Sequence, residues 1–304
     1  MATSPSRRVF IVFNPRSGRG RAAEALRPLA AELKARGFEP VDRPIDKGLP
    51  TESELRTVAA VVVAGGDGTV AAVSEQAAAA GTAIYHFPAG TENLFARENA
   101  MGGRPAQVAA WIAQGASRQL DLASFACGGA RRPMVLMLSA GPDAGVVKRL
   151  AAARTGAITK ASYVSHTLRE LVTPTLPEIT IEADGKSLVE RKRGMVIVAN
   201  CGRYGGGFDP AGDAVMNDGL LDVAFFPLGS AASWVWAMLM CKAGWRGSLP
   251  GVITARAKAV KVGLPTGGAV QADGEHIWAG AEPLQVLLEV KPLALRVCAA
   301  PNGA

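Results

Sequence analysis

A glycine-rich segment with an embedded carboxylate is the part of the sequence whose residue types most directly suggest chemistry. Gly65-Gly66-Asp67-Gly68-Thr69 lies between a continuous apolar run and an alanine-rich stretch, so it is expected to turn a buried strand into a helix. Glycines let the main chain approach a ligand closely, and the free amides at a helix start attract anions. The segment therefore predicts a phosphate-binding turn.

The carboxylate inside this turn has two interpretations. Asp67 would repel a bound phosphate, so it is expected either to hold a bridging Mg²⁺ or to cap a helix. Both stay open on the sequence alone. A Walker A sequence is absent, because Gly185-Lys186-Ser187 lacks the upstream glycine and has Thr180 in its place.

Two further turns have a comparable composition. They are Asn14-Pro15-Arg16-Ser17-Gly18 and Pro88-Ala89-Gly90-Thr91-Glu92-Asn93. In a parallel sheet all such turns emerge at the carboxyl edge, so their amides and polar side chains are expected to face one crevice. Arg16 adds a cationic donor there. For Arg19 and Arg21 a solvated helix start is an equally good interpretation.

The second half of the chain contains three Asp-Gly pairs. Asp184-Gly185 is assigned to a hairpin turn, because both residues suit the positive φ angles of a type I′ loop. The carboxylates and turn carbonyls of the segment 217–222 would also suit a hard cation. In Asp273-Gly274-Glu275 a carboxylate could take the proton of an alcohol that attacks a γ-phosphoryl group. For these two segments a plain turn remains equally open.

The elements that must position these residues alternate between strand and helix in the first part of the chain. This pattern predicts an α/β domain with a doubly wound parallel sheet over residues 1–122. The expected strands are 9–13, 59–64 and 82–87, and the expected helices are 22–33, 70–80, 92–99 and 105–114.

Beyond residue 122 short strands are separated by Gly, Pro and Asp-Gly turns. This spacing predicts an antiparallel β-sandwich domain over 123–304, and a return of the last segment to the first domain is left open. The expected strands are 134–139, 179–183, 195–199, 221–226, 260–263, 270–272 and 284–290, with helices inserted near 144–171 and 231–245.

Composition sets the class of protein. With 304 residues, 49% hydrophobic and 19% charged, the chain is expected to form two globular domains and is not disordered. The net charge of +7 is compatible with anionic partners and too weak to argue for nucleic acid. Scattered Cys and His argue against zinc and favour reduced thiols. No signal peptide is recognised, and the longest apolar run, Trp234 to Cys241, is far below the ~20 residues of a spanning helix. A cytoplasmic protein, soluble or peripheral at the inner membrane face, is expected.

The motifs NPRSG at 14–18, GGDGT at 65–69, PAGTEN at 88–93, NDGLLD at 217–222 and DGE at 273–275 occur in this order over nearly the whole chain. With them the sequence resembles the diacylglycerol kinase catalytic-domain family. It is most similar to the bacterial lipid kinases of that family, which are related to sphingosine and ceramide kinases. The resemblance implies ATP and Mg²⁺ in a cleft between a nucleotide-binding domain and a sandwich domain.

The resemblance also implies roles for individual residues. The nucleotide contacts fall on Asn14, Pro15, Arg16, Ser17 and Gly18, on Gly65 to Thr69, and on Gly90 and Thr91. The base carboxylate falls on Glu275, and a second-domain Mg²⁺ maps to Asp218 and the main-chain oxygens of Val215 and Leu220. A catalytic Mg²⁺ would lie between the phosphates and Asp67.

The sequence departs from the family pattern at three places. Ala71 and Ala72 replace a polar Asn-Glu pair, Leu94 replaces an acidic residue, and a threonine expected near Arg43-Pro44 has no counterpart. These departures concern the metal and substrate details more than the fold.

The function expected from these features is ATP-dependent phosphorylation of a lipid hydroxyl at a membrane surface. Gly-rich amides and Arg16 hold the phosphates, Asp67 organises Mg²⁺, and Glu275 activates the alcohol. A homodimer is left open. The segment Ser233 to Trp245 is interpreted as core packing, with a membrane-facing helix as the alternative.

Three other functions stay open. A soluble-substrate kinase resembling NAD kinase would keep GGDGT. A dinucleotide-dependent oxidoreductase would use Gly18 to Ala23 with Asp42. A non-catalytic nucleotide-sensing or lipid-binding protein would follow if the acid missing at Leu94 were essential.

Overall fold

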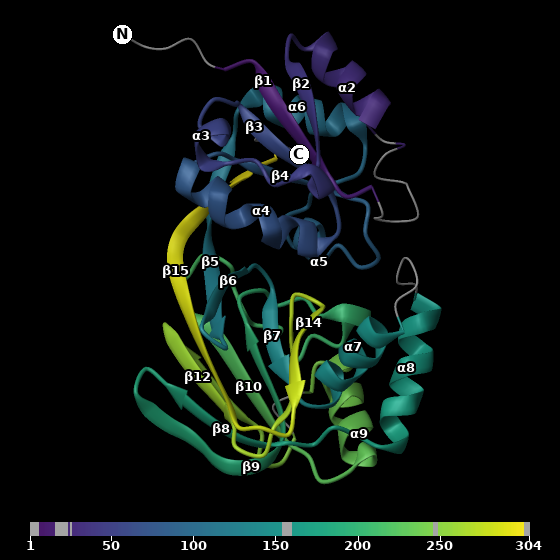
Figure 1. The fold of residues 1–304 in the computed structure, drawn as a ribbon, viewed down its shortest axis with the longest axis vertical. Coiled ribbons are helices and arrows are strands. Elements are labelled where there is room, and N and C mark those ends of the chain that lie inside the picture. The colour runs from purple at the N-terminus through teal and green to yellow at the C-terminus, as the bar shows by residue number, and fades with distance from the viewer. Residues whose placement is uncertain (1–5, 16–23, 25, 154–159, 246–248, 301–304) are drawn as a thin grey trace. The chain divides into compact units, whose positions relative to one another are not determined.

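The computed structural model describes residues 6–15, 24, 26–153, 160–245 and 249–300 of the chain. It divides into two compact units (Figure 1). Unit 1 comprises Met1–Leu122 and Leu293–Ala304, and unit 2 comprises Ala123–Pro292. Each unit is described by itself below.

Unit 1 is built on a parallel sheet. Strand β1 (Arg8–Phe13) lies between β2 (Glu39–Pro44) and β3 (Ala60–Gly65), and β4 (Ile84–Pro88) pairs with β3, all in parallel. All six residues of β3 are buried, as expected for a strand covered on both faces. The end of β15 (Leu284–Cys298) joins the sheet beside β4, where Val297 pairs with Ile84. The predicted parallel α/β domain is confirmed.

The four helices predicted in unit 1 occur in the predicted order with shifted ends, and the short helix α3 (Glu52–Leu55) was not predicted. Helix α4 begins at Asp67, three residues before the expected start, because Gly66 alone makes the turn after β3. Its last residue is Ala80, and its C-cap is Gly81, whose φ of 69° suits glycine. Helix α6 agrees with the expected range. The helices are α2 (Leu26–Ala35), α3 (Glu52–Leu55), α4 (Asp67–Ala80), α5 (Leu94–Glu98) and α6 (Pro105–Gln114), with a 3₁₀ turn at Ile45–Lys47.

Unit 2 is an antiparallel sandwich, as predicted. The long strand β9 pairs with β8 along its first part and with β7 and β10 along its second part. Alternate residues such as Val196 and Val198 enter a core shared by the other strands. Two strands are shared with unit 1: β15, whose first part lies in unit 2, and β5 (Ser117–Cys127), whose residues from Ala123 onward lie in unit 2. The other strands are β6 (Ala130–Met134), β7 (Met137–Ala140), β8 (Glu178–Ala183), β9 (Lys186–Ala199), β10 (Leu221–Pro227), β11 (Ile253–Ala257), β12 (Ala259–Leu264), β13 (Gly268–Ala272) and β14 (Glu275–Gly280).

Three of the expected strands differ from the structure. The strand expected over 284–290 continues to Cys298 as β15. The single strand expected over 134–139 is two strands, because the amides of residues 135–137 donate to the Asp273 carboxylate at the break between them. Strand β9 begins at Lys186, well before the expected Met195. Its first part is mostly exposed and rich in charge, so it carried no apolar signal.

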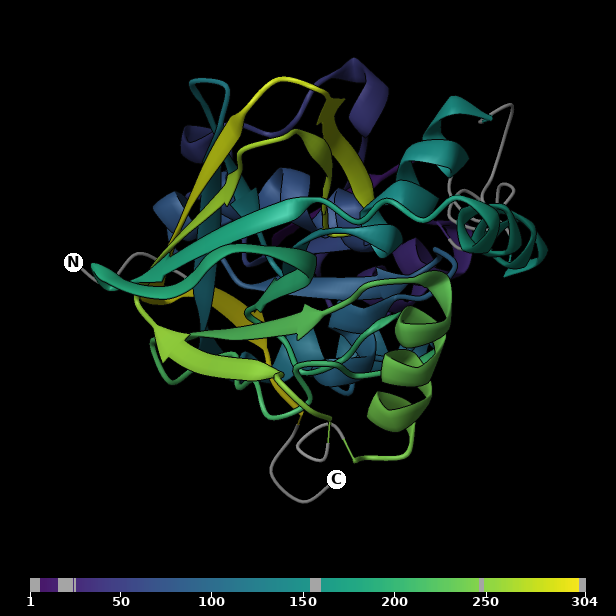
Figure 2. The same ribbon diagram turned by 90° about the horizontal axis from the view of Figure 1, so that it is seen from below.

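Three helices cover unit 2: α7 (Pro142–Ala152), α8 (Lys160–Val172) and α9 (Ala231–Lys242), with a 3₁₀ turn at Gly205–Gly207. Helix α7 packs against β13 and β14, and α8 contacts both α7 and α9 (Figure 2). None of the described helices has the length and apolarity needed to cross a membrane. All four cysteines are free thiols.

Candidate functional site

The carboxyl edge of the unit 1 sheet brings the predicted turns together. The Asn14 amide donates to the Ala64 carbonyl at 3.3 Å, and the Ala89 amide donates to the Gly65 carbonyl at 2.9 Å. The turns after β1, β3 and β4 are therefore adjacent along this edge. Asn14 and Pro15 are half-buried there, whereas Arg16, Ser17 and Gly18 lie outside the described residues.

The turn after β3 leaves no room for a side chain at Gly65. A Cβ on Gly65 would come within 2.5 Å of the Thr69 hydroxyl oxygen, because Thr69 packs back over the strand end. Gly66 occupies the N-cap position in extended backbone, and the Thr69 amide donates to the Gly66 carbonyl at 2.9 Å. The first amides of α4 therefore begin directly at this turn, where they can accept an anion.

The turn after β4 lies against the turn after β3. A Cβ on Gly90 would come within 2.6 Å of the Gly66 Cα. Asn93, with φ of 51°, closes the turn with its side chain. The side-chain oxygen accepts from the Gly90 backbone amide at 2.8 Å, and the side-chain nitrogen donates to the Gly90 carbonyl at 3.0 Å. Thr91 is exposed beside this turn.

Asp67 lies at the start of α4, but its side chain caps a different helix, α5. Its two carboxylate oxygens accept from the amides of Leu94 and Phe95, at 3.0 and 2.9 Å, at the start of α5. Asn93 makes no side-chain cap there because its left-handed backbone turns its side chain to Gly90. Asp67 thus joins the second and third turns.

Whether Asp67 can ligate a metal depends on how many lone pairs of its carboxylate remain unused. A carboxylate has about four lone-pair sites, and the two amide donors use two of them. Half-buried Asp67 can therefore still ligate a Mg²⁺ that bridges to phosphate oxygens. The neighbouring Leu94 offers no second carboxylate, so water and phosphate would complete such a shell.

A fully buried histidine supports the turn after β3 from below. His86 on β4 places Nε2 3.0 Å from the Gly65 carbonyl oxygen. Burial lowers the pKa of His86, opposed by the nearby Asp67 charge and by the Gly65 carbonyl. The ring is therefore neutral near pH 7, with Nε2 carrying the proton that it donates to Gly65. No motif in the sequence singles out this residue.

A hollow of about 370 Å³ opens at the same edge. It lies beside Ala89, and apolar groups dominate its lining. Its volume and largely apolar lining suit a heteroaromatic base. The lining residues are Glu24, Pro28, Phe87, Pro88, Ala89, Gly103 and Pro105.

In unit 2 the DGE segment forms a two-residue hairpin turn between β13 and β14. Asp273 and Gly274 both have positive φ, at 49° and 79°. The Asp273 carboxylate accepts from the amides of Val135, Leu136 and Met137 at 2.8 to 3.0 Å. Asp273 is thus a structural anchor, and the Glu275 carboxylate is exposed with no hydrogen bond or ion pair to the described residues.

A buried polar chain holds this turn from the other side. The Gly274 amide donates to the Gln271 side chain at 2.9 Å, and Gln271 donates to Ser139 at 2.7 Å. Ser139 and Tyr204 in turn donate to the Asp143 carboxylate. Burial raises the pKa of Asp143. No local sequence pattern marks these residues, because they come from three separate segments.

At the metal site predicted in the second domain, the guanidinium of Arg256 already pairs with the Asp218 carboxylate. Asp218 accepts from the Leu220 amide at 3.0 Å and forms an ion pair with Arg256, whose Nε also lies 3.5 Å from Asp222. Because the guanidinium neutralises Asp218, the donor set of Val215, Asp218 and Leu220 fits a Mg²⁺ poorly. The described residues contain no cluster of three or more metal-ligating side chains.

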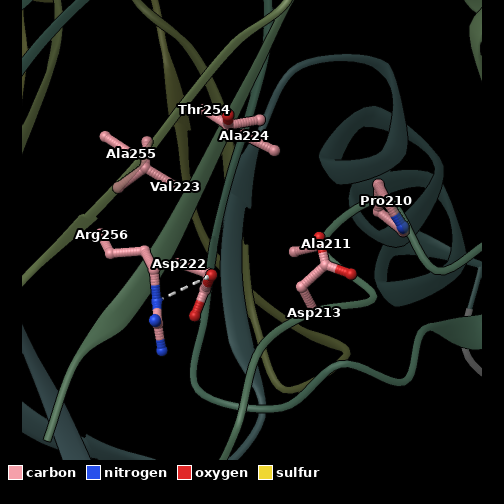
Figure 3. Close-up of a pocket in the computed structure, with 9 residues that line it drawn as sticks. All are labelled: Pro210, Ala211, Asp213, Asp222, Val223, Ala224, Thr254, Ala255 and Arg256. Atoms are coloured by element: carbon pink, nitrogen blue, oxygen red, sulfur yellow. Dashed lines mark ion pairs between the residues drawn. The ribbon is translucent and has the colours of Figure 1, made fainter. Parts of the chain in front are cut away.

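A hollow of about 300 Å³ adjoins this ion pair (Figure 3). Asp222 and Arg256 face each other on neighbouring strands, and Asp213 lies on the loop across from them. The hollow is lined by Pro210, Ala211, Asp213, Asp222, Val223, Ala224, Thr254, Ala255 and Arg256.

Comparison with known families agrees with both units. Residues 8–125 match the diacylglycerol kinase catalytic domain, and residues 136–299 match the YegS C-terminal NAD kinase beta sandwich-like domain. The first part of the chain belongs to the diacylglycerol kinase catalytic-domain family, and the second part belongs to the YegS C-terminal domain family. Proteins named diacylglycerol kinase from two strains of Mycobacterium tuberculosis, CDC 1551 / Oshkosh and H37Rv, are each 28% identical to it over 97% of this chain and 96% of their own.

Solved structures of the diacylglycerol kinase family share its fold. A putative diacylglycerol kinase from Bacillus anthracis str. Sterne superposes with a TM-score of 0.71 at 20% identity, over 99% of this chain and 100% of that one. The structure of yeast NADH kinase complexed with NADH superposes with a TM-score of 0.54 at 10% identity, over 99% and 85% of the two chains. The fold is therefore of the NAD kinase type.

Proposed function

We propose that the protein is an ATP- and Mg²⁺-dependent lipid kinase that transfers the γ-phosphoryl group of ATP to a lipid hydroxyl. The observation that carries the proposal is the pair of contacting turns, around Gly66 and Gly90, at the carboxyl edge of the unit 1 sheet. Membership of the diacylglycerol kinase family supports the reaction class.

Unit 1 binds the nucleotide in this proposal. The amides that begin α4 donate to phosphate oxygens beside the turn of Gly90 and Thr91, and the apolar hollow beside Ala89 takes the base. Asp67 would hold Mg²⁺, which supplies positive charge to the phosphate oxygens. Arg16, outside the described residues, is assigned to the same phosphates.

Unit 2 supplies the base. The Glu275 carboxylate accepts the proton of the lipid hydroxyl while that oxygen bonds to the γ-phosphorus and the bond from phosphorus to the β–γ bridging oxygen breaks, releasing ADP. Two sets of hydrogen bonds, from Asp273 and from Gln271, fix the turn that presents Glu275. A fixed base needs little reorganisation during the reaction.

The test is transfer of label from γ-labelled ATP to diacylglycerol, a sphingoid base and ceramide in mixed micelles, with NAD as a soluble acceptor. We expect Mg²⁺-dependent labelling of a lipid. Glu275→Gln should lower kcat by about a hundredfold or more and preserve ATP binding. Glu282→Gln, which changes another exposed carboxylate in the next turn, is the control and should act as wild type.

Each other result has a definite meaning. Full activity of Glu275→Gln removes Glu275 as the base. Labelling of NAD and of no lipid identifies a soluble-substrate kinase, the class to which the yeast NADH kinase with the same fold belongs by its name. Tight binding of NADH without binding of ATP identifies a dinucleotide enzyme.

A further inference from the structure

Helix α9 is apolar on two opposite sides. One side, formed by Trp234, Ala237, Met238 and Cys241, is buried. On the other, Val235, Trp236 and Leu239 are 40%, 58% and 53% exposed. Core packing, the interpretation preferred from the sequence, therefore accounts for only half of the helix. A helix with this composition has a second face to bury.

The exposed apolar residues of the protein gather around this helix. Nine large hydrophobic side chains are exposed among the described residues. Six of them lie on α8, on α9 or directly after α9: Leu168, Val172, Val235, Trp236, Leu239 and Trp245. The two helices contact each other on the outside of unit 2 (Figure 2). Apolar patches of this kind mark interaction sites.

The exposed charges described on helices α8 and α9 are of one sign. The sequence contains no Asp or Glu between Asp222 and Asp273. The single acid of α8, Glu170, is fully buried in an ion pair with Arg149. Among the side chains that the structure describes on the two helices, the exposed charged ones are Arg169 and Lys242, and the Lys242 ammonium lies 5.3 Å from the centre of the Phe208 ring.

We propose that this patch docks on the headgroup region of an anionic lipid bilayer. Tryptophan favours that region because its ring is apolar and its N–H is polar, and Lys or Arg beside it gains from the negative surface. A second copy of the chain is a poorer occupant, because an interface between two such patches would bring Arg169 and Lys242 of both copies together with no exposed acid of α8 or α9 between them. The inference deepens the proposed lipid kinase function, on which it rests, by giving the enzyme access to a membrane-embedded acceptor.

Vesicle flotation tests the docking directly. Wild type should float with vesicles of phosphatidylcholine and phosphatidylglycerol and much less with phosphatidylcholine alone. The double variant Trp236→Glu/Leu239→Glu should lose about tenfold or more in partitioning, because two apolar side chains leave the interface. Leu287→Glu, at a 43% exposed leucine of β15 away from the patch, is the matched control and should float as wild type.

A milder variant guards against misfolding. Brominated lipids should quench the tryptophan fluorescence of wild type, and Trp236→Phe, which keeps the apolar face, should remove part of the quenching.

In activity assays the double variant should phosphorylate a dispersed short-chain acceptor as wild type does. It should lose activity on an acceptor with the same headgroup in vesicles.

The outcomes separate this inference from the proposed function. If wild type phosphorylates a lipid in micelles but the double variant floats as well as wild type, the docking proposal is wrong and the function stands. If wild type floats through α9 but phosphorylates no lipid, the function is wrong and the docking stands. A solution dimer that the double variant dissociates, without vesicle binding, assigns the face to a second copy and overturns the proposal.

Discussion

Gly66 and Gly90 pack backbone to backbone. A Cβ built on Gly90 would lie 2.6 Å from the Gly66 Cα and 2.8 Å from the Asn93 side-chain oxygen, whereas a Cβ on Gly66 would have its nearest neighbour at 3.5 Å. Neither residue has a positive φ. Close approach, and not an unusual backbone angle, is what requires glycine at position 90.

This asymmetry predicts different effects of two alanine substitutions. Gly90→Ala should lower the free energy of unfolding by about 1–3 kcal/mol, because the backbones of two turns must separate. Gly66→Ala should change it by less than about 1 kcal/mol, since its Cβ meets only ordinary contacts. Urea unfolding followed by circular dichroism measures both. Equal losses from the two substitutions would contradict the close-packing explanation.

Asp67 is predicted to have a structural and a binding role that can be separated. In Asp67→Asn one carboxylate oxygen becomes an amide that cannot accept from Leu94 or Phe95, so the free energy of unfolding should fall by about 1–3 kcal/mol. Loss of the charge should also weaken Mg²⁺-dependent ATP binding, measured by calorimetry.

The control for this prediction is Asp184→Asn. Asp184 likewise accepts from two backbone amides, those of Lys258 and Ala259, in unit 2. It should reduce stability to a similar degree and leave ATP binding unchanged. If Asp67→Asn binds MgATP as wild type does, Asp67 is a helix cap only.

Arg256 is predicted to make unit 2 independent of magnesium. In wild type, Mg²⁺ at millimolar concentration without nucleotide should leave the Tm unchanged, because Arg256 already neutralises Asp218. In Arg256→Gln the carboxylates of Asp218 and Asp222 lose this partner, so the Tm should fall and Mg²⁺ should restore part of it. Differential scanning calorimetry with increasing Mg²⁺ gives the answer.

Lys261→Gln serves as the comparison, because it removes an exposed ion pair with Glu182 on a neighbouring strand. Its Tm should respond to Mg²⁺ no more than that of wild type. A wild-type Tm that rises with Mg²⁺ as much as that of Arg256→Gln would show that the ion coexists with the guanidinium.

His86 predicts an acid limb in the stability of the protein. Its folded pKa is lowered by burial, so on acidification the unfolded chain takes up the proton first, near pH 6.5. Stability from this group is complete above that pH and is lost as pH falls toward the lower folded pKa, with a slope of up to about 1.4 kcal/mol per pH unit.

Replacement of the ring should remove that slope. His86→Gln keeps an N–H for the Gly65 carbonyl and does not titrate, so its free energy of unfolding should vary less between pH 7 and pH 5. His276→Gln is the control, because His276 is only partly buried and should account for a smaller part of the slope. An unchanged slope in His86→Gln would place the acid sensitivity elsewhere.

The sequence allowed the turns to be predicted because their signals are local. Gly65 to Thr69 directly follows a buried apolar run, and Asp184-Gly185 is a hairpin turn in the structure, with both φ values positive, as Asp-Gly favours. The partners of the carboxylates could not be predicted in this way. Asp67 caps a helix 27 residues away, and Asp218 pairs with Arg256, 38 residues away. Such pairings depend on strand order, which the local pattern does not contain.

The interior supports of the site were missed for the same reason. Asp143 follows a Gly-Pro pair that suggests only a turn, and its pKa is raised because the folded chain buries it, an effect that the hydrogen bonds from Ser139 and Tyr204 oppose. His86 lies in the apolar strand β4, where the sequence alone would suggest only an ordinary core residue. In both cases burial, which only the assembled fold provides, gives the residue its chemistry.

The path of β15 constrains how this protein can be dissected genetically. The strand starts in unit 2, and its last residues belong to unit 1, where Leu295 and Val297 are fully buried and the Ala299 amide donates to the Ala116 carbonyl. A gene fragment that stops at residue 122 would expose the edge of β4 and leave a hole in the apolar interior. A self-sufficient nucleotide-binding piece would need residues 293–300 grafted back onto it, so expression boundaries chosen at the apparent domain border should yield aggregates.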